Sequence, residues 1–188
     1  MKRILLLVLC TLFISQFGFA QEADSLKTDS TENIYRTKIN SAEDYNRNYK
    51  LSLLEIEMGT LQAMLFIGDA CSAWSDAIYN NEYKGRYVKD FHDALSLYRK
   101  DREYDKYWDE FVNSKEKIKP RIKSLNQYSP YFNKEAFDGL VKVSALYNEY
   151  YDYALSPSGS YNDYSEKTKE LEKSIKRLLY ELEVRYTY

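Results

Sequence analysis

Glu57 is the charged side chain whose position could give it unusual chemistry. At about 100° per residue it falls within an apolar arc of one predicted helix, formed by Leu53, Leu54, Leu61 and Met64. An unpaired buried carboxylate is costly, so we expect Glu57 to have a partner. An antiparallel arrangement of helices brings Arg185, Tyr131 and Tyr186 near its level. The sequence therefore predicts a buried Glu57–Arg185 pair or a Glu57–tyrosine hydrogen bond, with a ligand-binding or acid–base carboxylate as the alternative.

Tyrosine is over-represented, with 20 residues in a chain of 188. Nine tyrosines flank two predicted turns that an up-down helical arrangement places at the same end: Tyr79, Tyr83, Tyr87, Tyr147, Tyr150, Tyr151, Tyr153, Tyr161 and Tyr164. Because tyrosine combines an apolar ring with a polar tip, this group predicts a protein- or glycan-binding surface. The alternative is that the rings cover the edges of the core and the hydroxyls make ordinary hydrogen bonds.

His92 is the only histidine, which limits the metal sites that the chain can form. Di-iron bundles need a Glu-x-x-His motif on two helices, and zinc sites combine several His or Cys ligands. Because His92 lies off the apolar stripe of its segment, we favour a partly exposed histidine over a haem ligand. The sequence also lacks Ser-His-Asp, Cys-His, Walker and glycine-rich phosphate-binding patterns. We therefore expect no enzyme activity, no cofactor and no metal.

The first twenty residues have the pattern of a cleaved signal peptide. Two basic residues precede an apolar stretch at 4–14, and Gly18 and Ala20 place small residues before a cleavage site at Gln21. We expect the protein to be exported, either periplasmic or secreted. Residues 21–40 are polar and lack periodicity, which indicates a flexible segment that tethers the domain or is simply disordered.

Removal of the leader changes the composition of the mature chain. Cys10 is lost, so Cys71 is the only cysteine; its apolar neighbours favour a small buried side chain over a reactive or intermolecular thiol. The 27 Lys+Arg of the whole chain become 25 against 29 Asp+Glu, a mature charge of about −4. No polybasic block is present, which argues against a nucleic-acid partner. We expect no integral membrane span after cleavage.

The remaining chain favours long helices, because only 6 glycines and 3 prolines interrupt the whole sequence. The first helix is predicted from a Ser41–Asp44 capping pair to about Asn80, before a turn at Asn80, Asn81 and Gly85. Its expected buried stripe contains Leu53, Leu54, Met58, Leu61, Met64, Leu65, Cys71, Trp74 and Ile78.

The second segment, 86–127, carries two apolar stripes offset by more than about 90°. Supercoiling drifts only about 20° per heptad, so one straight helix cannot carry both stripes. We expect a kink, bulge or break in the charged run 99–103. Pro120 falls opposite the second stripe, which predicts a bent but continuous helix there.

The last two helices are shorter. One is predicted from an Asn133 cap to about Leu155, and the other begins at a Ser160–Asp163 pair. The expected fold is all-α: an antiparallel up-down four-helix bundle over 41–188, with long first and second helices and the second kinked or broken near 99–103.

These features predict an exported, non-catalytic binding module or structural adaptor that acts through its tyrosine-rich end. The partner would be a protein or a glycan, and the oligomeric state is left open. The alternative is a periplasmic carrier of a small ligand, with a pocket between helices near Glu57.

Overall fold

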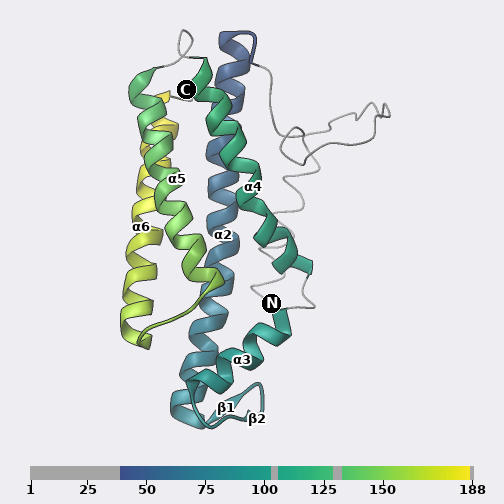
Figure 1. Ribbon diagram of the computed structural model, residues 1–188. Coiled ribbons are helices and arrows are strands. Elements are labelled where there is room, and N and C mark those ends of the chain that lie inside the picture. Colours follow the sequence, from purple (N-terminus) through teal and green to yellow (C-terminus); the bar gives the residue numbers. More distant parts are fainter. Residues whose placement is uncertain (1–38, 103–105, 129–132, 187–188) are drawn as a thin grey trace, which may run out of the picture. The chain divides into compact units, whose positions relative to one another are not determined.

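The computed structural model describes residues 39–102, 106–128 and 133–186, all within one compact unit (Figure 1). They form five helices and a two-stranded hairpin: α2 (Ala42–Asn80), β1 (Glu82–Tyr83), β2 (Arg86–Tyr87), α3 (Phe91–Arg102), α4 (Lys106–Gln127), α5 (Lys134–Leu155) and α6 (Tyr161–Tyr186). The fold is all-α, as predicted. The predicted signal peptide at 1–20 and most of the polar segment 21–40 lie outside the described residues.

Helix α2 is the centre of this assembly, because it packs against each of the other four helices. Helices α4 and α6 each pack against both α2 and α5. Gly59 permits the close approach of α5 to α2: a Cβ at this position would lie 2.3 Å from the hydroxyl oxygen of Tyr147. The largest cluster of buried side chains therefore lies between α2 and α5, with contributions from α4 and α6.

The inward face of α2 differs from the predicted stripe. Leu54, Leu65 and Ile78 were expected to be buried but are exposed. The inward face mixes large and small side chains. The large ones are Tyr45, Tyr49, Leu53, Ile56, Phe66, Ile67 and Trp74, and between them lie Ser52, Gly59, Thr60, Ala63, Ala70, Ala73 and Ala77. The prediction is confirmed for Leu53 and Trp74 and wrong for the three exposed residues, because periodicity does not report which of two apolar faces is covered. In this helix the small residues face the neighbouring helices and let their backbones come close.

The predicted helix starts are confirmed by their hydrogen bonds. The Ser41 hydroxyl oxygen accepts from the Asp44 amide at 3.1 Å, and the Asn133 side chain accepts from the Glu135 amide at 2.9 Å. The Ser160 hydroxyl oxygen accepts from the Asp163 amide at 3.1 Å. Each side chain satisfies an amide that the first helical turn leaves without a backbone partner.

The two interruptions expected in the second segment have different outcomes. Separate helices are present on either side of the predicted break, since α3 ends at Arg102 and α4 begins at Lys106. Helix α4 continues through Pro120, as predicted. Pro120 lies at the partly exposed edge of this helix, where water can reach the backbone carbonyl that lacks an amide partner.

The hairpin was not predicted, because the second segment was expected to be helical from residue 86. Lys84 and Gly85 have positive φ angles of 49° and 74°, the conformation of a two-residue type I′ turn. The pairs Glu82–Tyr87 and Tyr83–Arg86 face each other across the two strands. The hairpin and α3 share with α2 a second, smaller cluster of buried residues: Ala70, Ala73, Ala77, Tyr83, Val88, Ala94, Leu95 and Tyr98.

Among the described helices, α2 alone is long and apolar enough to cross a membrane by length and composition. The central helix of a helical assembly meets the same test, and α2 contacts all four of its neighbours. The absence of a membrane span in the mature chain therefore stays a prediction.

Candidate functional site

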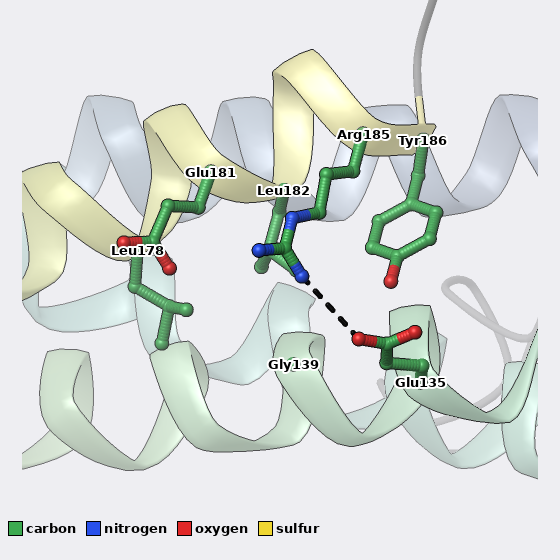
Figure 2. Close-up of a pocket in the computed structure, with 7 residues that line it drawn as sticks. All are labelled: Glu135, Gly139, Leu178, Glu181, Leu182, Arg185 and Tyr186. Carbon is green, nitrogen blue, oxygen red and sulfur yellow. Dashed lines mark hydrogen bonds and ion pairs between the residues drawn. The ribbon is translucent and has the colours of Figure 1, made fainter.

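The predicted Glu57–Arg185 pair is wrong. Glu57 lies on the exposed side of α2, and Arg185 instead pairs with Glu135 at 3.3 Å (Figure 2). The error follows from the misassigned stripe, because the arc of leucines around Glu57 is largely on the outer side of the helix. Partial desolvation, and then the nearby Glu183 carboxylate, raise the pKa of Glu57.

Arg185 lines a small open groove between the start of α5 and the end of α6 (Figure 2). The other lining residues are Glu135, Gly139, Leu178, Glu181, Leu182 and Tyr186. A Cβ at Gly139 would lie 2.4 Å from Leu182 Cδ2, so the two helices touch at the floor of the groove. Its volume of about 130 Å³ is well below the roughly 300–1,000 Å³ of typical ligand pockets. Glu57 does not line it, so this groove is not the carrier pocket that the sequence suggested.

The more buried carboxylate of α2 is Glu55, two residues away. Its oxygen lies 2.7 Å from Arg121 of α4 in an ion pair that is mostly shielded from water. Burial raises the pKa of Glu55, and the charges of Arg121 and Lys117 partly oppose this. The pair ties α4 to α2. The sequence could have indicated a buried Glu55 only if the buried face of α2 had been assigned correctly.

Five of the nine tyrosines are buried, so the predicted nine-residue surface is corrected. The buried ones are Tyr83, Tyr147, Tyr150, Tyr151 and Tyr164, and Tyr153 and Tyr161 are half-buried. Two of the buried hydroxyls donate to backbone carbonyls: Tyr151 to that of Val112 at 2.7 Å, and Tyr164 to that of Tyr153 at 3.1 Å. Most of this group therefore follows the alternative interpretation, in which the rings fill the core.

Tyr79 and Tyr87 remain at the surface, with 76% and 77% of their areas exposed. Tyr79 lies in the last turn of α2 and Tyr87 lies on β2, immediately after the hairpin turn. Ile78, which precedes Tyr79, is also exposed. We call Ile78, Tyr79 and Tyr87 the hairpin-end surface.

Asp101 of α3 holds the hairpin in place. Its carboxylate accepts hydrogen bonds from Lys84 at 2.9 Å, from Tyr83 at 3.1 Å and from Arg86 at 3.2 Å. These donors, Lys84 first, lower the pKa of Asp101 to about 2 against a smaller opposing effect of desolvation. The Val88 amide also donates to the Asn81 carbonyl at 2.9 Å, which closes the base of the hairpin. Tyr87 is therefore carried on a strand that is fixed to the helices.

Cys71 and His92 lie in surroundings that indicate no special reactivity. Cys71 is half-buried, and burial raises the pKa of its thiol against a smaller effect of Lys169, which disfavours the reactive thiolate. His92 is exposed and its ring lies 5.6 Å from that of Phe91. No group of three or more His, Cys, Asp and Glu side chains suited to a metal occurs within the part of the chain that the structure describes.

Comparison of the chain with protein-family models, curated proteins and solved structures finds no match. Function must therefore be inferred from the geometry of the surface itself.

Proposed function

We propose that this protein is an exported, non-catalytic binding module or structural adaptor that contacts a protein or glycan through its hairpin-end surface. The observation that carries the proposal is the exposure of Tyr79 and Tyr87, which exceeds that of every other large hydrophobic side chain in the described residues. They lie at one end of the helices, whereas most of the other tyrosines in the predicted group are buried.

The chemistry of tyrosine supports this assignment. Its ring supplies a large contact area, its hydroxyl can bond to a polar partner, and it is enriched in interfaces. The rigid support of Tyr87 matters as well, because a side chain on an ordered strand loses less conformational entropy on binding than one on a mobile loop. The bonds of Lys84, Arg86 and Tyr83 to Asp101 provide that support.

The arrangement of the helices supports the accessibility of this surface. We propose that α2, α4, α5 and α6 form an up-down four-helix bundle, with α3 and the hairpin appended at one end. Support comes from Figure 1, where α2 and α5 run in one direction while α4 and α6 run in the other. In this arrangement the hairpin-end surface lies at a tip of the bundle, accessible to a partner.

A photo-cross-linking amino acid at position 87 of the exported chain tests the binding surface. Tyr180 on α6 provides the control position, because it is a tyrosine of similar exposure, 68%, on another helix. We expect a cross-linked partner from position 87 and not from position 180. Truncation of Tyr79 to Ala in the same chain should reduce the yield at least about tenfold, as for an interface residue worth 1.4 kcal/mol. Equal yields from both positions, or no cross-link from position 87, would contradict the proposal.

Export is tested separately. The amino-terminal sequence of the protein recovered from outside the cytoplasm should begin at Gln21. Recovery of the full-length chain from the cytoplasm alone would contradict export while leaving the hairpin-end surface open to its own test.

A further inference from the structure

The hairpin has two faces, which differ in charge. Glu82 lies opposite Tyr87 and Tyr83 lies opposite Arg86, so the two side chains of each pair share one face. The Tyr83–Arg86 face turns toward α3, because both side chains bond to Asp101 and the Arg86 guanidinium lies 5.3 Å from the centre of the Tyr83 ring. The Glu82–Tyr87 face therefore turns away from α3, and both of its side chains are exposed.

The other exposed tyrosine of this end also has a carboxylate beside it. Asp76 is exposed and precedes Tyr79 by three residues, so the two side chains are neighbours on the surface of α2. The Asn81 amide donates to the Asp76 carbonyl, and the Val88 amide donates to the Asn81 carbonyl at 2.9 Å. These bonds fix the strand that carries Tyr87 to the end of α2 (Figure 1).

The two carboxylates are not neutralised by the side chains around them. Within the part of the chain that the structure describes, neither Asp76 nor Glu82 has an ion pair or a side-chain hydrogen bond. The cations of the hairpin, Lys84 and Arg86, pair instead with Asp101 on the opposite face, at 2.9 Å and 3.2 Å. The exposed tyrosines are therefore flanked by negative charge.

The end of α2 adds to this negative charge. The last turn of the helix contains no basic residue, although the carbonyl groups at a helix C-terminus favour a cation. Lys89 follows β2 and is exposed, but Asp90 and Asp93 lie next to it at the start of α3. The charges around the hairpin-end surface therefore favour a positively charged partner.

We propose, on the basis of the function proposed above, that the partner is a protein that presents lysine or arginine side chains to Tyr79 and Tyr87. A cation over a tyrosine ring is attracted by the electrons of the ring face. The same cation can donate a hydrogen bond to Asp76 or Glu82, and arginine suits both contacts because its planar guanidinium stacks and donates at once. A neutral glycan would use the rings without the charge, and an acidic glycan would be repelled, so the carboxylates favour a basic protein.

Fluorescence anisotropy of two labelled ten-residue peptides tests the charge of the partner on the mature chain. One peptide alternates arginine with glycine, and the other alternates glutamate with glycine. We expect the arginine peptide to bind and the glutamate peptide not to bind. Asp76→Asn together with Glu82→Gln should weaken binding of the arginine peptide at least about tenfold. Tyr87→Leu should weaken it as well, because leucine keeps an apolar side chain but has no ring.

Glu43→Gln together with Asp138→Asn is the matched control. It removes the same charge from two exposed carboxylates near the starts of α2 and α5, away from the hairpin, and should leave the affinity unchanged. Equal weakening by both double variants would show a general attraction to an acidic chain and would overturn the inference. Absence of binding of the arginine peptide at about 1 mM, or preference for the glutamate peptide, would overturn it as well.

The cross-linker at position 87 separates this inference from the proposed function. In the chain with Asp76→Asn and Glu82→Gln, we expect the yield of cross-linked partner to fall at least about tenfold. An undiminished yield, or a glycan as the cross-linked partner, would overturn the basic protein partner while supporting the hairpin-end surface as a binding site. Absence of any cross-link from position 87 of the parent chain would contradict the proposed function itself.

Discussion

Two glycines of α2 differ in what surrounds them. A Cβ at Gly59 would lie 2.3 Å from the Tyr147 hydroxyl oxygen and 2.6 Å from its ring carbon, whereas a Cβ at Gly68 would meet nothing within 4 Å. Alanine is about 1 kcal/mol more favourable than glycine in a helix interior. Overpacking a buried site costs about 1–3 kcal/mol or more. The same substitution should therefore have opposite effects at the two positions.

We predict that Gly59→Ala destabilises the protein by about 1–3 kcal/mol and that Gly68→Ala stabilises it by up to about 1 kcal/mol. Urea unfolding at a low protein concentration measures both. Tyr147 cannot move away freely, because its ring is buried and its hydroxyl lies 3.1 Å from that of Ser114. A stabilising Gly59→Ala substitution would contradict the close packing of α5 on α2.

Asp101 makes the stability of the hairpin depend on pH. The pKa of its carboxyl is lowered from 3.8 to about 2 by the hydrogen bonds of Lys84, Arg86 and Tyr83. Because the pKa is lower in the folded protein, the carboxylate contributes stability above about pH 4 and loses that contribution as the pH falls toward 2.

We predict that Asp101→Asn destabilises the protein by about 1 kcal/mol at pH 7, since the site is partly exposed. The difference between wild type and Asp101→Asn should shrink between pH 4 and pH 2, where the wild-type carboxyl becomes protonated. Urea unfolding at several pH values provides the measurement. A difference that stays constant down to pH 2 would argue against the carboxylate as the anchor of the hairpin.

At the scale of elements, the hairpin and α3 have a core of their own. It is formed with the last part of α2 and is smaller than the cluster between α2, α4, α5 and α6. Tyr98 links the two regions, because its hydroxyl donates to the Phe66 carbonyl at 3.0 Å. A small cluster of this kind opens locally at a lower free energy than the main core.

We predict that Leu95→Ala lowers amide-exchange protection in 82–102 by about 2–4 kcal/mol and changes protection in α5 and α6 much less. Hydrogen-exchange mass spectrometry of the whole protein measures this. Leu140→Ala provides the comparison, since Leu140 is buried in the larger cluster and its truncation should lower protection across all the helices. A uniform loss in the Leu95→Ala protein would mean that the two clusters unfold together.

The elements could be predicted from sequence where local signals determine them. Caps such as Ser41 and Asn133 act within one helical turn, and the offset between the stripes of 86–98 and 104–125 indicated a break without any tertiary information. The hairpin was missed because two paired residues per strand are too few for a periodic pattern. Its turn depends on Lys84 in a positive-φ conformation that lysine seldom adopts, and tertiary bonds to Asp101 support it.

For the whole molecule, the site residues could be placed from sequence only if the inward face of α2 was assigned correctly. Both faces of this helix are apolar, so periodicity could not say which one meets the other helices. Because the leucines were predicted to be buried, Glu57, which lies among them, was predicted to be buried as well. The ion pair of Glu55 with Arg121 was not predicted. The prediction of a nine-tyrosine surface was wrong for a related reason. Tyrosine is suited both to a core and to a surface, so the sequence could not show that Tyr147 is buried while Tyr87 is exposed.

The distribution of residue sizes around α2 has a consequence for how the protein tolerates mutation. Alanine and glycine on the inward face leave no space for a larger side chain, so Ala63 and Ala70 should reject enlargement as strictly as other proteins reject truncation of a core leucine. The exposed leucines Leu54 and Leu65 should accept polar replacements with little effect on folding. In a comprehensive substitution scan, the buried small side chains of α2 would therefore be among its least replaceable, and the exposed leucines would be among its most tolerant.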